Sequence, residues 1–204
     1  FNASDTDNTI TSNGMSFVNV DFNDVSGTGR WELQDAFVTS GDFTVSRTDT
    51  TGNGVNLAGN SLSVGGNFIL GNGAFGAKVT TGASAISASG NWTIGTNGTF
   101  VSTGSTVTFN ATDGDNTIRS NARSFGNVTF NGAGGVWSLQ DSLDVIVGLS
   151  LRARKEQRFK SIIILSFFLQ IFTFCTTMDV SIWFLQIASR KYHLIQNNIW
   201  LLFN

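Results

Sequence analysis

A duplicated segment constrains the fold of this chain more than any other feature of its sequence. Residues 1–23 align without gaps on residues 109–131, at an offset of 108 positions, and 16 of the 23 aligned residues are identical. After a two-residue deletion the match resumes, with residues 31–35 (WELQD) corresponding to residues 137–141 (WSLQD). An internal repeat of this kind indicates a fold built from successive copies of one structural unit.

A shorter repeat runs inside the long one. Residues 41–45, 66–70 and 90–94 each read glycine, short polar residue, aromatic, any residue, aliphatic, at spacings of 25 and 24 residues. A weaker copy begins at Gly148. Between these marks Val, Thr and Phe alternate with polar residues, and Gly or Asn-Gly interrupts the alternation every few residues. This pattern predicts short strands with one buried face, and no helical periodicity is found before residue 151.

Two all-β architectures fit these repeats. One is a β-sandwich of hairpins, and the other is a parallel β-helix, or β-solenoid, of ~20–25-residue coils over residues 1–151. The solenoid is favoured because the repeated unit is too short to be a domain. Each copy also carries the same residue types at the same place.

Stacked coils would bring equivalent residues of successive repeats above one another. The predicted core stack consists of Phe43, Phe68 and Trp92. The polar residues just before them would form a corner or outward ladder, which consists of Asp42, Asn67 and Asn91. Trp31 and Trp137 also recur among aliphatic neighbours, so we expect them in the core rather than on a sugar-binding surface.

Composition divides the chain near residue 150. All 23 glycines lie at or before Gly148, and the chain has no proline and one cysteine, Cys175. The first 150 residues carry 12 acidic and 5 basic side chains, for a net charge of −7, whereas the remainder carries 2 and 7, for a net charge of +5. The first part is therefore not a collagen, a disulfide scaffold, a coiled coil or a basic nucleic-acid binder.

The repeats resemble those of a known class of protein. The segments GNWTIGTNGTFVSTGSTVTFNATDGDNTI (90–118) and SFGNVTFNGAGGVWSLQDSL (124–143) are similar to the Gly/Asn/Thr-rich regions of large bacterial secreted and surface proteins, the haemagglutinin-like or autotransporter-passenger-like β-solenoids. This resemblance implies an extracellular or cell-surface stalk or adhesin region within a longer parent chain. It brings no catalytic residues and no cofactor.

Residues 152–204 form a second part, an apolar and basic tail that we expect to be helical or disordered. An uncharged run from 161 to 178 has about the length of a membrane-spanning helix and a basic flank, so one interpretation is a C-terminal membrane anchor. The favoured alternative is a frameshift or assembly artefact, because glycine stops abruptly in the middle of a coil. A buried pair of helices is the third possibility.

Paired aspartates are the sharpest polar motifs. They occur in Asp5-Thr-Asp7 and Asp113-Gly-Asp115, and carboxylates at alternate positions of a turn are oxygen ligands of the kind that Ca²⁺ takes. A distal bidentate Glu is missing, so turn formation is the favoured explanation and these four residues are weak calcium candidates. No other metal or cofactor site is predicted.

The predicted function is structural or adhesive and non-catalytic, with glycans or a host or neighbouring cell surface as partners, no nucleic acid, and a membrane only through 161–178. The alternative is a carbohydrate-active β-helix enzyme, a polysaccharide lyase or hydrolase, which needs carboxylates grouped on one face. Candidates for such a group are Asp21, Asp24, Asp35 and Asp42. Asp35 recurs as Asp141, which favours a structural role for both.

Overall fold

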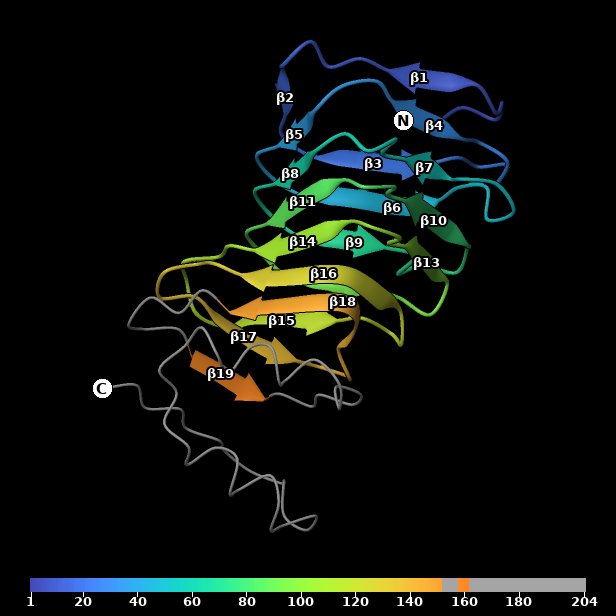
Figure 1. The fold of residues 1–204 in the computed structure, drawn as a ribbon. Helices are drawn as coiled ribbons and strands as arrows, with labels where there is room; N and C mark the ends of the chain where they lie inside the picture. Colours follow the sequence, from blue (N-terminus) through green and yellow to red (C-terminus); the bar gives the residue numbers. More distant parts are fainter. Residues whose placement is uncertain (152–157, 162–204) are drawn as a thin grey trace.

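The computed structural model describes residues 1–151 and 158–161. Within them, nineteen short strands wind into a parallel β-solenoid of about six turns, here called coils, of about 23 residues each (Figure 1). The predicted fold class is confirmed, and the β-sandwich alternative is wrong because the strands pair in parallel. The predictions for the tail, residues 152–204, fall outside the described part except at 158–161, which form a strand.

The strands form three sheets that run along the solenoid. Sheet A contains, in spatial order, β1 (Asn8–Ile10), β4 (Trp31–Leu33), β7 (Val55–Asn56), β10 (Ala77–Thr80) and β13 (Gly98–Val101). Sheet B contains β2 (Ser16–Phe17), β5 (Phe37–Thr39), β8 (Leu62–Val64), β11 (Ala85–Ala88), β14 (Thr106–Phe109), β16 (Ser124–Phe130) and β18 (Asp144–Leu151). Sheet C contains β3 (Val20–Asn23), β6 (Phe43–Arg47), β9 (Phe68–Leu70), β12 (Trp92–Ile94), β15 (Asn116–Arg119), β17 (Val136–Leu139) and β19 (Arg158–Ser161).

Coil length varies along the solenoid. Paired residues are 26 positions apart at Trp92 and Ile118 but 20 positions apart at Ser124 and Asp144. In the described part, sheet A ends at β13, and the long strand β16 then continues sheet B. Sheet C extends past the boundary predicted at Leu151, because β19 pairs with β17. Within residues 1–151 and 158–161, no helix is long and apolar enough to cross a membrane.

Aromatic side chains fill the space between the sheets. The Phe43 and Phe68 rings stack with centroids 5.6 Å apart, and Phe68 stacks on Trp92 at 3.8 Å with an interplanar angle of 6°. All three side chains are completely buried. The predicted stack is therefore confirmed. The inward residues of each short coil pack against those of the next coil, so the stacked coils share one continuous core.

A ladder of polar side chains runs along the corner that precedes sheet C. The backbone N–H of Asp42 donates to Asn19 Oδ1 (2.8 Å), and that of Asn67 donates to Asp42 Oδ1 (2.8 Å). The Asn91 N–H donates in turn to Asn67 Oδ1 (3.0 Å), and the Thr117 N–H donates to Asn91 Oδ1 (2.8 Å). This ladder confirms the prediction. Each side chain occupies a backbone donor of the following coil, which would otherwise need water.

The glycines beside this ladder are required by close contact between coils. A Cβ atom added at Gly90 would lie 2.6 Å from the carbonyl oxygen of Gly66, and one at Gly66 would lie 2.5 Å from Asp42 Oδ1. Real Cβ atoms do not approach other atoms this closely. The glycine of the repeat therefore allows the corner to stack tightly enough for the side-chain ladder to form.

The two copies of the long repeat share sheet B at Ser16–Phe17 and at residues 124–125, but their other strands lie in different sheets. The segment Asn-Thr-Ile forms β1 in sheet A in the first copy and starts β15 in sheet C in the second. The local packing is nevertheless preserved. Phe22 meets Trp31 edge-on at 5.3 Å and 65°, and their counterparts Phe130 and Trp137 meet at 5.3 Å and 66°. The repeated unit is thus independent of the face that it occupies.

Candidate functional site

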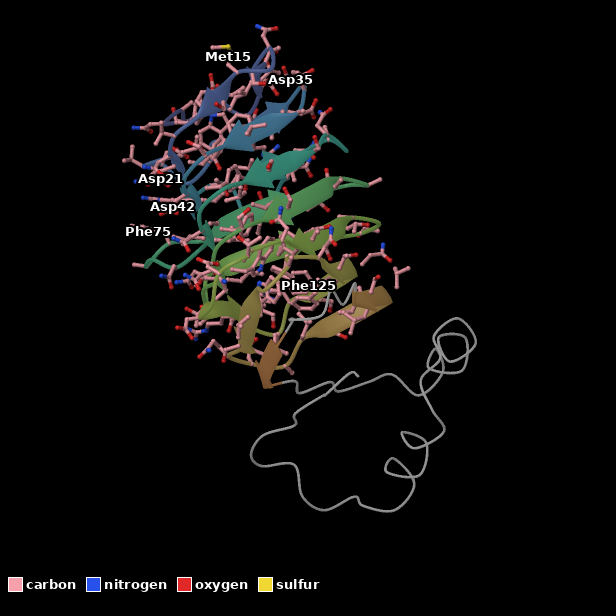
Figure 2. All side chains as sticks on the ribbon, turned by 90° about the vertical axis from the view of Figure 1, so that its left-hand side faces the viewer. Met15, Asp21, Asp35, Asp42, Phe75 and Phe125 are labelled. Carbon is pink, nitrogen blue, oxygen red and sulfur yellow. The ribbon has the colours of Figure 1, made fainter. Side chains whose placement is uncertain are left out.

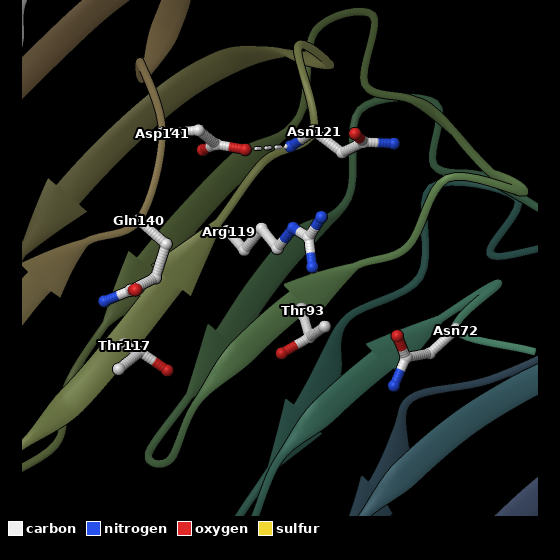
Figure 3. A pocket seen from close by; sticks show the side chains of 7 residues that line it. All are labelled: Asn72, Thr93, Thr117, Arg119, Asn121, Gln140 and Asp141. Carbon is white, nitrogen blue, oxygen red and sulfur yellow. Dashed lines mark hydrogen bonds between the residues drawn. The ribbon is translucent and has the colours of Figure 1, made fainter.

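An open polar groove lies on the outer face of sheet C. It has a volume of about 600 Å³ and crosses the consecutive strands β12, β15 and the end of β17 (Figure 3). Seven residues line it, all of them polar: Asn72, Thr93, Thr117, Arg119, Asn121, Gln140 and Asp141. Thr93 is the register partner of Arg119 on the neighbouring strand. The groove floor is therefore built by the regular stacking of outward side chains.

Arg119 is the only cationic residue in this lining. It ends β15 and its side chain is exposed, pointing into the groove between Thr93 and Gln140 (Figure 3). Within residues 1–151 and 158–161, the structure contains one ion pair, between Arg30 and Asp49, so Arg119 is not paired with a carboxylate there. Its guanidinium is available to a ligand. The first copy of the long repeat has Thr11 at the equivalent position.

The Asp141 carboxylate is the one acidic group in the groove, and both of its oxygens accept hydrogen bonds from the protein. The Ser120 backbone N–H donates to Asp141 Oδ1 (2.8 Å), as does the Ser120 hydroxyl (2.9 Å). The Asn121 N–H donates to Asp141 Oδ2 (2.5 Å; Figure 3). Because both oxygens accept hydrogen bonds from the preceding coil, Asp141 stabilises the groove wall and is poorly suited to act as an acid or base.

The other groove residues are also held by the solenoid. The Asn121 side-chain amide donates to the carbonyl oxygen of Gly95 (2.8 Å), and the Thr117 hydroxyl donates to Asn91 Oδ1 (2.9 Å). The Gln140 amide donates to the Ser138 hydroxyl (3.3 Å). The wall is thus preformed, with its orientation set by contacts between coils.

Asp35 holds the same position in the first copy as Asp141 in the second. The Ser12 N–H donates to its Oδ1 (2.8 Å) and the Asn13 N–H donates to its Oδ2 (2.7 Å). The hydrogen bonds from the Ser12, Asn13 and Gly14 backbone and from the Ser12 hydroxyl lower the pKa of Asp35 against the opposing effect of its partial desolvation. Asp35 is therefore a structural cap, as its repetition predicted.

Two further carboxylates are buried at the corner that follows sheet C. Burial alone would raise the pKa of Asp24, but N–H groups of Gly29, Ser26 and Thr28 and the Ser26 hydroxyl donate to it, and the net pKa lies well below its usual range. Each of these bonds favours the charged form. Asp24 therefore closes the loop between β3 and β4 and cannot reach a substrate.

Asp49 has the same role one coil later. Burial would raise its pKa, but the Thr51 hydroxyl and N–H, the Arg30 guanidinium and the Gly52 N–H donate to it and lower the pKa from 3.8 to about 2. The Asp49 side chain is 7% exposed, against 39% for Arg30. This ion pair joins successive corner loops and is a structural feature.

The four candidate catalytic aspartates do not form one group. Asp24 is buried, and Asp35 lies on the opposite side of the solenoid from Asp21 and Asp42 (Figure 2). Asp21 Oδ1 accepts a hydrogen bond from the Ser46 hydroxyl (2.7 Å), and Asp42 belongs to the corner ladder. Of the four, Asp21 and Asp42 lie on one side of the solenoid, and Asp24 and Asp35 do not join them.

The calcium candidates lie in exposed turns before β1 and β15. The main-chain oxygen of Asp5 accepts the Asn8 side-chain amide (3.0 Å), and Asp113 Oδ1 accepts the equivalent amide of Asn116 (2.9 Å). Asp7 is exposed, and Asp115 has a positive φ of 69°. In the described part of the chain, no three acidic, His or Cys side chains converge in a way that would hold a metal ion.

Trp31, Trp92 and Trp137 lie in the core, as predicted. Trp92 and Trp137 are completely buried and Trp31 is 3% exposed. The sequence did not identify Arg119 as a site residue, although one signal was present. Arg119 is a charged residue at a place where the duplicated copy has a neutral one, Thr11.

Comparison of the chain with protein-family models, with curated proteins and with solved structures finds no match. The class of the protein therefore follows from its architecture. It is a parallel β-solenoid repeat protein with an open polar groove on one sheet.

Proposed function

We propose that this chain is a structural, non-catalytic segment of a secreted or cell-surface bacterial protein, which projects or presents binding surfaces. The observation that carries the proposal is the use of the repeated polar groups. The corner residues from Asn19 to Asn91 bond one coil to the next, and Asp35 and Asp141 do the same at another corner. Polar side chains used in this way lengthen a rod and leave few groups to act on a substrate.

The haemagglutinin-like or autotransporter-passenger-like class is the finer form of this proposal. It is supported by the resemblance of residues 90–118 and 124–143 to the repeats of those proteins, and by the net charge of −7 in the first 150 residues. The partners would be glycans or the surface of a host or neighbouring cell. The location would be extracellular or on the cell surface.

The location can be tested with antibodies raised against the folded protein. On the proposed function, they label intact, unpermeabilised cells of the source organism or precipitate the protein from its culture medium. Labelling that needs cell lysis, together with none in the medium, would contradict the proposal. An antibody against a cytoplasmic protein serves as the control for cell integrity.

The second candidate is a carbohydrate-active β-helix enzyme, which the groove on sheet C favours. The single carboxylate in its lining, Asp141, is held by Ser120 and Asn121, which weakens this candidate. Incubation with a panel of acidic and neutral polysaccharides distinguishes the two. The structural function predicts no new reducing ends and no unsaturated uronate, whereas release of either would establish an enzyme.

A further inference from the structure

We propose that the groove on sheet C binds the carboxylate group of an acidic oligosaccharide, a uronic-acid-containing glycan, and that Arg119 pairs with that carboxylate. This inference rests on the proposed function and names the ligand class of its binding surface. Its central residue, Arg119, is not shared by the two copies of the repeat, since its equivalent in the first copy is Thr11.

The donors in the groove favour an anionic acceptor. A guanidinium presents its N–H groups in a planar fork that matches the two oxygens of a carboxylate. Arg119 is surrounded by the side chains of Asn72, Asn121 and Gln140, which also carry N–H donors (Figure 3). The one carboxylate nearby, Asp141, already accepts hydrogen bonds from Ser120 and Asn121 and does not compete for the guanidinium within the described residues.

The shape of the site favours a sugar over a peptide. Each strand under the groove is paired on both sides, since β12 lies between β9 and β15, and β15 lies between β12 and β17. A peptide therefore finds no free strand edge on which to add backbone hydrogen bonds. The lining also provides no apolar pocket for peptide side chains. Hydroxyl and amide groups on an open floor suit the hydroxyls of a glycan.

Charge along sheet C places the ligand at one end of the sheet. Near the N-terminal end the outward side chains include Asp21, and Asp42 lies at the adjoining corner (Figure 2). Three coils further on, Thr93 and Arg119 are outward-facing register partners. The groove lining carries one cation, Arg119, and one carboxylate, Asp141, so an anionic ligand is repelled less there than near Asp21 and Asp42.

The test is a titration of the full chain with trigalacturonate and, separately, with its methyl ester, followed by calorimetry or NMR. We expect the free acid to bind and the ester to bind at least about tenfold more weakly, because esterification removes the charged acceptor. Arg119→Thr copies the residue found at position 11 and should weaken binding of the acid by a similar factor. Added salt should weaken binding of the acid to the natural protein.

Two variants serve as matched controls. Lys78→Thr removes another partly exposed cation, from the outer face of β10 in sheet A, and should leave binding unchanged. Thr11→Arg places an arginine at the equivalent point of the first copy, where Glu32 takes the place of Ser138, and should create no second site. Unfolding temperatures of all variants establish that they are folded.

Several results would overturn the inference. Equal affinity for acid and ester, no binding of the acid at millimolar concentration, or binding unaffected by Arg119→Thr would each do so. A glutamate-rich peptide that binds as tightly as the glycan, with the same dependence on Arg119, would show that the sugar is not recognised. A negative binding result would not contradict the proposed surface location or the proposed lack of enzymatic turnover, because antibody labelling and polysaccharide incubation test those separately.

Discussion

Asp35 and Asp141 occupy the same place in two copies of one local structure. Each carboxylate accepts two backbone N–H groups from the previous coil, at 2.8 and 2.7 Å for Asp35 and at 2.8 and 2.5 Å for Asp141. The strand before the corner belongs to sheet A in the first copy (β1) and to sheet C in the second (β15), whereas the strand after it belongs to sheet B in both (β2 and β16). The same aspartate therefore caps a corner between sheets A and B and a corner between sheets C and B.

Removal of either cap should destabilise the protein. For Asp141→Ala we expect the free energy of unfolding to fall by about 1–3 kcal/mol, because two backbone N–H groups lose their partner. Asp35→Ala should act in the same direction. Urea unfolding followed by circular dichroism measures both, with Asp7→Ala as the control at an exposed aspartate. An Asp141→Ala variant as stable as the Asp7→Ala control would show that the caps do not hold the coils together.

The turn that these aspartates cap offers a second prediction. Asn13 and Gly14 have φ values of 51° and 76°, and their counterparts Asn121 and Ala122 have 50° and 57°. Alanine is strained in this left-handed region, whereas glycine is not. Ala122→Gly should therefore stabilise the protein by up to about 1 kcal/mol. Gly14→Ala should destabilise it by about as much, since an added Cβ at Gly14 meets no atom within 4 Å and only backbone strain is introduced.

Thermal or urea unfolding of the two variants checks this prediction. Gly73→Ala is the control, because Gly73 is also free of contacts around the added Cβ but has no positive φ. Opposite signs for Ala122→Gly and Gly14→Ala support the equivalence of the two turns. A destabilised Ala122→Gly variant would refute it.

The sequence predicted the contacts within and between neighbouring repeats well. The stack of Phe43, Phe68 and Trp92 follows from the repeat alone, because residues one coil apart must lie in register when coils stack. The exchange of sheets between the two long copies was not predicted. It depends on the sum of the lengths of the coils between the copies. These lengths vary, from 21 residues between Ala77 and Gly98 to 26 between Trp92 and Ile118, and no local pattern fixes their sum.

The candidate site was harder to predict than the fold. Asp24 was considered as a catalytic residue, but it is buried by its own loop, where Ser26 and Gly29 donate to it. Loop closure of this kind depends on backbone geometry that a single sequence does not show. The groove around Arg119 arises from side chains on β12 and β15 and in the loops that follow β9, β15 and β17, and their convergence depends on the register between coils.

The buried aspartates predict that acid destabilises the solenoid. The folded pKa of Asp49 is about 2, below its ordinary value of 3.8, and that of Asp24 is also lowered. A carboxylate with a depressed folded pKa stabilises the fold above its unfolded pKa, and this contribution is lost as the pH falls through the folded value. Stability should therefore decline from about pH 4 towards pH 2, by about 2 kcal/mol through Asp49 alone.

Asp49→Asn tests the source of this acid sensitivity. The variant should be less stable than the natural protein at pH 7, and its stability should change less between pH 4 and pH 2. Urea unfolding at a series of pH values measures the slope, and Asp7→Asn provides the matched exposed control. An unchanged slope in Asp49→Asn would assign the acid sensitivity to other groups.

The duplication also predicts how the first coil can be stabilised. Phe109 is completely buried, whereas its counterpart Phe1 is 45% exposed. Ala88 of the preceding coil is the register partner of Phe109. Fusion of residues 85–108 in front of Phe1 should cover its side chain in the same way. Full burial of a phenylalanine side chain stabilises a protein by about 1.5–3 kcal/mol, and the gain here is smaller because Phe1 is already partly buried.

The measurement for this prediction is the unfolding temperature of the fusion. It should exceed that of the natural chain, while a fusion with the same 24 residues in scrambled order should not. The fused segment, residues 85–108, is 24 residues long. Equal unfolding temperatures for the ordered and scrambled fusions would mean that the coil sequence does not specify its stacking partner.

We propose that this β-solenoid binds a uronic-acid-containing glycan through the Arg119 groove and does not cleave it. One measurement addresses both parts: a proton NMR time course of unesterified trigalacturonate with the full chain, in its natural form and with Arg119→Thr. We expect saturation transfer to the sugar from the natural protein, strongly reduced transfer from Arg119→Thr, and an unchanged sugar spectrum after prolonged incubation. New reducing-end or unsaturated-uronate signals with the natural protein, or transfer that persists undiminished in Arg119→Thr, would contradict it.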